Sequence, residues 1–300
     1  LAPITYPMAT LYTQQDKNVR KTWLLMTTFL VLIVAIGFVF AQIYGNPNIL
    51  YGFFAFSLLM NIYAYWNSAK IALRVSRAIP ADENKYRELH NIIENLSITA
   101  GLPKPKVYII NDPAPNAFAT GRNAKHSAVA FTTGILEILD KNELEGVAAH
   151  ELSHIGNKDI LLSTIAVVLA GFISLIADIF LRSNLFRGSR DQDNKAGSIM
   201  MIVGIVLAIL APIFATLVQF SISRKREFLA DASGALLTRY PEGLASALKK
   251  ISSYSRPMQN AHQATAHLFI SNPFGAKNIK NLFSTHPPVE DRINALLGKK

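Results

Sequence analysis

The sequence has 300 residues, half of them apolar, and a formal net charge of +10. A soluble domain of this size does not need so much apolar surface, so the composition predicts membrane-spanning helices. The chain contains no cysteine, which excludes a cysteine nucleophile, a disulfide framework and any thiolate metal site. Its basic residues flank the apolar runs and accompany no nucleic-acid-binding motif. We therefore interpret them as juxtamembrane charges and predict no nucleic-acid partner.

Two apolar runs near the start predict a transmembrane hairpin over residues 22–70. Residues 22–44 are enough for a helix that crosses a bilayer, which takes about 20 residues. Residues 49–66 follow after a short turn and end in aromatic residues typical of the membrane interface. Residues 1–21 are polar and are expected in the cytoplasm. Basic residues at both outer ends of the hairpin indicate that orientation: Lys17, Arg20, Lys21, Lys70, Arg74 and Arg77.

Residues 71–159 are more polar and are predicted to lie outside the membrane. Apolar residues recur at helical spacing over residues 83–100, and Gly101-Leu102-Pro103 is a stop signal for that helix. Residues 107–110 and 128–133 are short runs typical of β-strands. These patterns indicate an α+β fold that is mainly helical and contains a small sheet.

A capped helix follows the second predicted strand. Asp140 is a typical N-cap, and Glu143 three residues later completes a capping box. This helix contains His150-Glu151-Leu152-Ser153-His154 and can end at Gly156. Its histidines lie four residues apart on one face, where both imidazoles can bind one Zn²⁺ at about 2.0–2.1 Å. Glu151 can then accept a proton from the attacking water, so the pattern predicts a metallopeptidase and not two surface histidines.

Two further apolar runs predict a second membrane hairpin over residues 160–220. They cover residues 160–181 and 198–220. Buried helices of a soluble core are the alternative, because Asp178 lies inside one run and Pro212 inside the other. The loop between the runs is basic where the positive-inside rule expects few such residues: Arg182, Arg187, Arg190 and Lys195.

A catalytic zinc usually has three protein ligands, and without cysteine the third must be His, Asp or Glu. Glu227 and Asp231 are four residues apart, so Glu227 could bind the metal while Asp231 holds a ligating imidazole. A surface acidic pair explains the same spacing equally well. The other candidates are the remaining histidines: His90, His126, His262, His267 and His286. His262 and His267 are five apart and are expected on the surface.

The sequence resembles the HtpX-type membrane zinc metallopeptidases, relatives of the CAAX prenyl proteases. The resemblance covers most of the chain and combines the zinc-binding helix with distant segments. The matching residues are 116–121, 128–134, 150–159, 223–231, and 284–288 with Arg292. The combination is far more specific than the zinc-binding pattern by itself, which many metallopeptidases share.

The resemblance implies a site and an activity. It implies one Zn²⁺ per chain, held by His150, His154 and Glu227, in a zincin-like catalytic domain made of residues 71–159 and 221–300. It implies a multi-pass protein of the cell (inner) membrane, with its catalytic site facing the cytoplasm. Its substrates are expected to be polypeptides, namely misfolded or damaged membrane proteins, and its role membrane protein quality control.

Three other segments have expected roles. The run 128–133 resembles the edge strand on which such enzymes bind an extended substrate, although an ordinary sheet strand gives the same pattern. His286 could donate to the tetrahedral oxyanion, or could simply precede a helix start at Pro287-Pro288. Arg292 is expected to be a structural ion-pair partner. A catalytically inactive zinc-binding scaffold is the alternative function, and the presence of Glu151 argues against it. A transporter ranks lower, because few positions in the runs are ionisable or broken.

Overall fold

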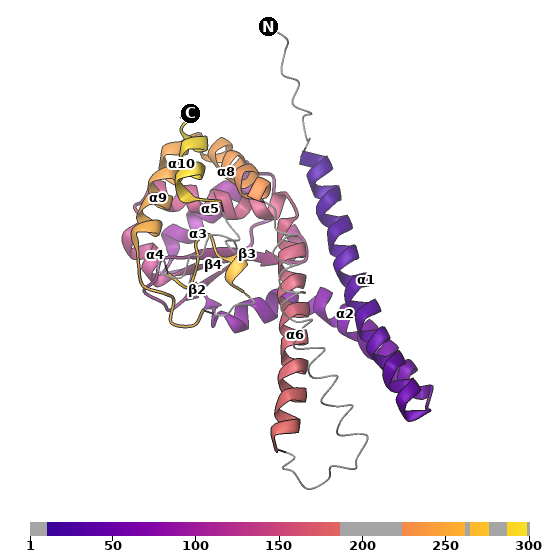
Figure 1. Ribbon diagram of the computed structural model, residues 1–300. Coiled ribbons are helices and arrows are strands. Elements are labelled where there is room, and N and C mark those ends of the chain that lie inside the picture. The colour runs from indigo at the N-terminus through magenta and orange to yellow at the C-terminus, as the bar shows by residue number, and fades with distance from the viewer. Residues whose placement is uncertain (1–10, 187–223, 262–264, 276–286, 299–300) are drawn as a thin grey trace.

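The computed structural model describes residues 11–186, 224–261, 265–275 and 287–298 (Figure 1). In these ranges the chain is mainly helical with one small mixed sheet, as predicted. The predicted fourth apolar run, 198–220, lies outside the described residues.

The first two helices form the predicted hairpin, but both are longer than the apolar runs. Helix α1 is Leu11–Tyr44 and α2 is Asn48–Val75. Gly45 has φ +61° in the turn between them, a conformation that glycine adopts without steric cost. Both helices are long and apolar enough to cross a membrane. The N-terminal turns of α1 were predicted only as a polar flank, and they continue the helix beyond its apolar part.

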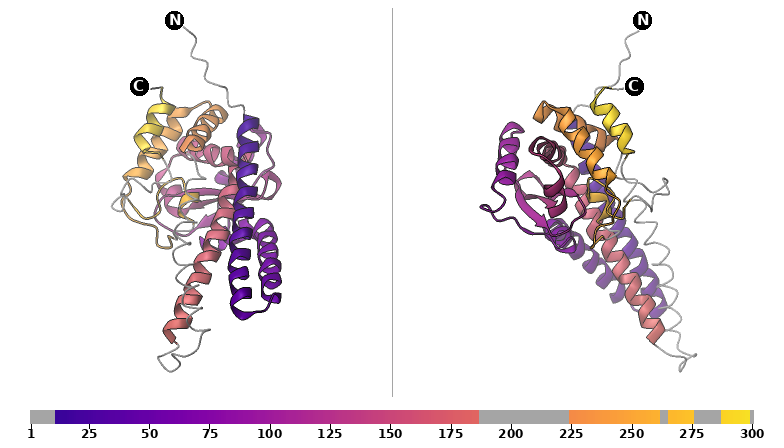
Figure 2. Two further views of the ribbon diagram at one scale, coloured as in Figure 1. Left: turned by 45° about the vertical axis from the view of Figure 1, so that its right-hand side comes forward. Right: turned by 90° about the vertical axis from the view of Figure 1, so that its left-hand side faces the viewer.

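Helix α6, Asp159–Phe186, packs beside this hairpin. The three helices extend together away from the sheet (Figures 1 and 2). Their buried contact is apolar, with Phe29, Ala64 and Leu162 among its members. Helices α5, Lys141–Gly156, and α6 meet at a bend of 82°, so within the described residues α6 counts as a third candidate span only together with α5.

The sheet has four strands in the order β1-β2-β4-β3. Strand β4 pairs in parallel with β2 on one side and antiparallel with β3 on the other. The strand bounds are Ile79–Pro80 (β1), Lys106–Ile110 (β2), Ala117–Gly121 (β3) and Ser127–Thr132 (β4).

The prediction that residues 128–133 form an edge strand is therefore wrong. All six residues of β4 are buried, as expected for a strand with neighbours on both sides and layers on both faces. The edge strands are β1 and β3, and the sequence pattern identified neither as a strand. Of the five residues of β3, Ala-Phe-Ala-Thr-Gly, only Phe118 and Thr120 favour a strand, so tertiary packing decides its conformation.

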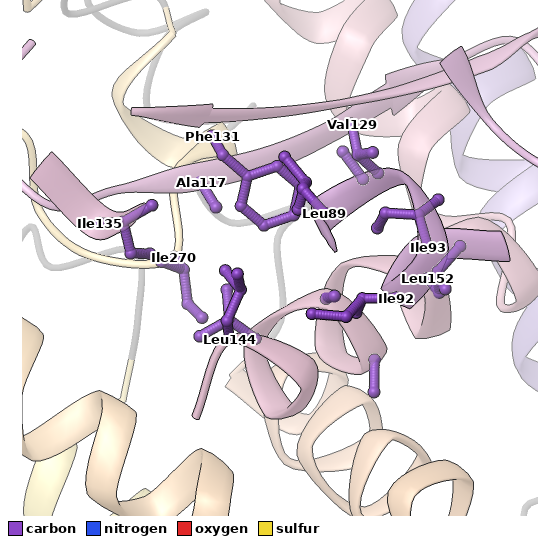
Figure 3. Close-up of a cluster of buried hydrophobic side chains, with 14 of the residues drawn as sticks. Leu89, Ile92, Ile93, Ala117, Val129, Phe131, Ile135, Leu144, Leu152 and Ile270 are labelled. Atoms are coloured by element: carbon purple, nitrogen blue, oxygen red, sulfur yellow. The ribbon is translucent and has the colours of Figure 1, made fainter. Parts of the chain in front are cut away.

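The main core lies between one face of the sheet and the helices α3, Arg87–Thr99, and α5. Val129 and Phe131 of β4 alternate toward this core, as side chains of a strand must (Figure 3). Leu144 and Leu152 of α5 fill it from the opposite side. Helix α5 is thus held against the sheet along its length, beside β3. The other α-helices of the described residues are α4, Thr133–Ile138; α8, Arg224–Thr238; α9, Pro241–Ser253; and α10, Val289–Leu296.

Candidate metal centre

Helix α5 begins with the predicted capping box. The Asp140 carboxylate accepts from the Glu143 N–H at 3.0 Å, and the Glu143 carboxylate accepts from the Asp140 N–H at 2.9 Å. Lys250 and Ser246 of α9 each donate to Glu143 at 2.6 Å. These bonds fix the start of the helix against its neighbour, and they set the direction in which its later residues point.

Three side chains from two helices converge near the end of α5. The Nε2 atoms of His150 and His154 lie 3.1 Å apart. The Glu227 carboxylate of α8 lies 4.0 Å from the first nitrogen and 3.7 Å from the second. Ligand atoms each about 2.0 Å from a tetrahedral centre are separated by about 3.3 Å. The observed distances bracket that separation, so the three groups fit a metal ion.

Glycine in α8 makes this convergence possible. A Cβ on Gly234 would lie 3.0 Å from the backbone nitrogen of His150, so α8 rests directly on the backbone of α5. Glu227 lies seven residues before Gly234, two helical turns away on the same face. The close approach of the two helices therefore brings the Glu227 carboxylate to the histidine pair.

His150 is held from behind by Asp231. The Nδ1 atom of His150 lies 2.9 Å from the Asp231 carboxylate. Arg292 of α10, itself fully buried, donates to both oxygens of that carboxylate at 2.8 and 2.7 Å. Burial alone would raise the pKa of Asp231, but the hydrogen bonds from Arg292 and His150 outweigh it and lower the pKa. The ion-pair role predicted for Arg292 is confirmed.

His154 has an acidic partner of its own, Asp159, the first residue of α6. The carboxylate lies 3.0 Å from Nδ1 of His154. Burial would lower the pKa of His154, but the Asp159 hydrogen bond and the charge of Glu227 outweigh it and raise the pKa to about 9. Sequence reasoning did not single out Asp159. The available signal was an acidic residue at the first position of a helix, five residues after a predicted ligand.

Glu151 is buried beside the ligand group. Its Oε2 atom has no hydrogen-bond partner among the described residues. Burial raises the pKa of Glu151 to about 7. A buried carboxylate oxygen without a partner is costly unless something else occupies the site. A metal ion with its water would supply what this oxygen lacks.

A cavity of about 30 Å³ lies between these groups. It has room for a water molecule or a metal ion and is too small for a peptide. Its other wall is residues 267–270, whose backbone lies along the sheet edge: the Ile270 N–H donates to the Ala117 carbonyl at 2.9 Å. The side-chain amide of Asn116 makes two hydrogen bonds with the backbone of Ser271: it donates to the carbonyl and accepts from the N–H.

The surface position predicted for His267 is wrong. His267 lines the cavity and is buried, with its Nε2 atom 3.2 Å from the Ser163 carbonyl of α6. The chain packs this segment between α6 and β3, which spacing along the sequence cannot reveal. Among the other histidines weighed as ligands, His90 contacts the Ala81 carbonyl and His126 is exposed beside Asn123. His262 and His286 lie outside the described residues.

The fold and the ligand group together define a membrane metallopeptidase. The chain belongs to peptidase family M48, whose pattern matches residues 83–300. It is 48% identical to the protease HtpX homolog of Caldanaerobacter subterraneus over 293 residues, which cover 96% of this chain and 97% of that protein. It is 47% identical to the protease HtpX homolog of Pyrococcus furiosus over 279 residues, covering 92% and 94%.

A solved structure shows the same fold at lower similarity. The crystal structure of S. mikatae Ste24p superposes with a TM-score of 0.51 at 20% sequence identity. The match covers 95% of this chain and 66% of that one, so the present chain spans about two thirds of the larger protein.

Proposed function

We propose that this protein is a zinc endopeptidase in which His150, His154 and Glu227 bind the metal and Glu151 is the catalytic base. The observation that carries the proposal is the convergence of the three ligands beside a buried carboxylate oxygen that lacks a partner. Two imidazoles and one carboxylate are the ligand set of a catalytic zinc site that keeps its fourth position open. One Zn²⁺ per chain accounts for all three groups.

The residues of the chain divide the work of hydrolysis. Bound Zn²⁺ would act as a Lewis acid for the scissile carbonyl and lower the pKa of its water. Glu151, buried beside the three proposed ligands, accepts a proton from the attacking water and delivers it to the leaving amine. His286, the proposed oxyanion donor, lies outside the described residues.

We further propose that a substrate peptide binds along β3. The Asn116 carbonyl accepts from the Thr132 N–H, so the alternation of an antiparallel pair turns the N–H and C=O groups of Ala117, Ala119 and Gly121 away from β4, toward the edge of the sheet. An extended peptide can pair with such an edge. Residues 267–270 occupy part of it and close the cavity, so this segment must move when a peptide binds.

The test of catalysis is Glu151→Gln, with Glu145→Gln on the same helix as the matched control. Glutamine keeps the size of the side chain but cannot accept the proton. We expect wild-type zinc content in both variants and peptidase activity in the control only. Activity near that of the wild type in Glu151→Gln would eliminate Glu151 as the base. If the wild type cleaves peptides while Glu151→Gln keeps its zinc and is inactive, the alternative of a catalytically inactive zinc-binding scaffold is ruled out as well.

We propose that the site faces the cytoplasm, in the cell (inner) membrane, and acts on misfolded or damaged membrane proteins. The basic flanks of the α1–α2 hairpin support this orientation. Since His154 precedes the third apolar run and Glu227 follows the fourth, the chain must cross the membrane an even number of times between them.

Single cysteines in this cysteine-free chain test the orientation. We expect an impermeant thiol reagent to label Ser189→Cys in intact cells and to label Ser252→Cys, exposed at the end of α9, only after lysis. Ser189 lies in the predicted outer loop, beyond the described residues. Labelling at position 252 in intact cells would reverse the orientation. Labelling of neither position before lysis, and of both after it, would mean that the third and fourth runs do not cross.

A further inference from the structure

The membrane helix α1 touches the metal centre. Its N-terminal turns run past the bend between α5 and α6, and two of its side chains donate hydrogen bonds there. Gln15 donates to the Gly156 carbonyl at 2.7 Å. Asn18 donates to the Asn157 carbonyl at 3.1 Å and to the Asp159 carboxylate at 2.6 Å. Asn18 thereby contacts a residue, Asp159, that itself contacts a proposed metal ligand.

The contacts of Asn18 determine how its amide lies. Both of its partners are oxygens that can only accept, so the NH₂ group of the amide must face them. Asp159 then uses its two oxygens on opposite sides: Oδ1 accepts from Asn18 and Oδ2 contacts Nδ1 of His154. Arg226 of α8 lies 3.5 Å from Oδ1 and adds a positive charge. Asn18 and Asp159 are both buried, so solvent does not replace a bond that is lost.

We infer that Asn18 is a positioning residue for the metal ligand His154 and acts through Asp159. The inference rests on the proposed function, because it takes His154 as a zinc ligand. An imidazole that binds zinc is oriented by the group at its second nitrogen, and that group must itself be held. Asp231 is held by Arg292 within the catalytic region. Asp159 is held by Asn18 of the membrane helix and by Arg226 of α8.

This arrangement makes α1 a part of the metal site as well as an anchor. The family pattern matches residues 83–300, so Asn18 lies outside the segment that identifies the peptidase. A displacement of α1 along or away from the bend would remove the hydrogen bond from Asn18 to Asp159 and so loosen the orientation of His154. The affinity for zinc therefore depends on where the membrane helix lies.

Zinc affinity of the full chain, measured by competition with a chelating dye, tests the inference. Asp159→Ala should weaken zinc binding by about 10–100-fold, as loss of a partner behind a ligand does. Asn18→Ala and Asn18→Leu should each weaken it by about tenfold. Leucine has the same branched outline as asparagine but makes no hydrogen bond, whereas alanine leaves space, so equal losses in the two variants would show that the hydrogen bond matters. Gln15→Ala removes a bond from α1 to the same bend without touching Asp159, and it should bind zinc like the wild type.

A double mutant decides whether Asn18 acts through Asp159. If it does, Asn18→Ala in an Asp159→Ala background costs nothing further. Wild-type zinc affinity in both Asn18 variants, full additivity in the double mutant, or an equal loss in Gln15→Ala would each overturn the inference. Circular dichroism of each metal-free variant checks that it folds, and the leucine variant serves if the alanine variant does not. A wild type that binds no zinc would refute the proposed function instead.

Discussion

Gly234→Ala should separate α8 from α5 and weaken the metal site without touching a ligand. The added Cβ would lie 3.0 Å from the backbone nitrogen of His150 and 3.2 Å from its Cα. Carbon atoms in ordinary contact are about 3.5–4.0 Å apart, so the two helices must move apart by roughly 0.3–0.5 Å. The obstacle is backbone in a packed helix, which cannot swing aside as the end of a side chain can.

Two opposing terms set the effect on stability. Alanine is favoured over glycine in a helix by about 1 kcal/mol. Overpacking a tight contact costs about 1–3 kcal/mol. The net expectation is a destabilisation of about 0–2 kcal/mol, small enough for the variant to fold. Zinc binding should suffer more, because ligand distances must hold to about 0.2 Å and Glu227 moves with α8. We expect a loss of zinc affinity of about tenfold or more, similar to the loss of an outer partner.

The assay is zinc affinity by chelator competition, together with thermal unfolding of the metal-free protein. Gly156→Ala is the control, because its Cβ would meet only Cδ1 of Leu102 at an ordinary 3.6 Å and it lies on the same helix as the histidines. That variant should bind zinc like the wild type. If Gly234→Ala binds zinc like the wild type and gains the full 1 kcal/mol or so of helix propensity, the argument from helix approach is refuted.

Two further predictions concern the third ligand and the start of α5. Glu227→Ala should bind zinc far more weakly than the wild type, because two imidazoles alone make an incomplete site. If metal analysis shows unchanged zinc affinity, the third ligand is another residue. Burial would raise the pKa of Glu143, but the hydrogen bonds from Lys250 and Ser246 outweigh it and lower the pKa. The stabilisation by this carboxylate is therefore present above its ordinary pKa near 4.5 and is lost as pH falls through the lower value in the folded protein. Glu143→Gln should lower the free energy of unfolding by about 1 kcal/mol at pH 7, and the difference from the wild type should vanish in acid. Urea unfolding at a series of pH values measures both free energies. A difference that does not change with pH would contradict this assignment.

The sequence by itself predicted the local features of this protein. The α1–α2 hairpin follows from apolar runs of spanning length, and the start of α5 from the pair Asp140 and Glu143, whose reciprocal bonds the structure shows. The alignment of His150 and His154 follows from helical geometry alone. These features depend on residues within a few turns of one another, where spacing determines geometry. Spacing alone could not identify Glu227 as the third ligand, because a surface acidic pair explains the same spacing equally well. Only the family resemblance favoured the ligand role.

Tertiary structure decided which distant residues meet at the site. The edge strand beside α5 is β3 and not β4, because pairing with β2 on one side and β3 on the other places β4 inside the sheet. His267 is buried, because its segment packs between α6 and the sheet edge. Asp159 and Asn18 lie behind His154, because the bend after α5 brings the start of α6 against a membrane helix some 140 residues earlier in the chain. Such contacts depend on strand order and helix approach, and these are settled by how the whole core packs and not by local pattern.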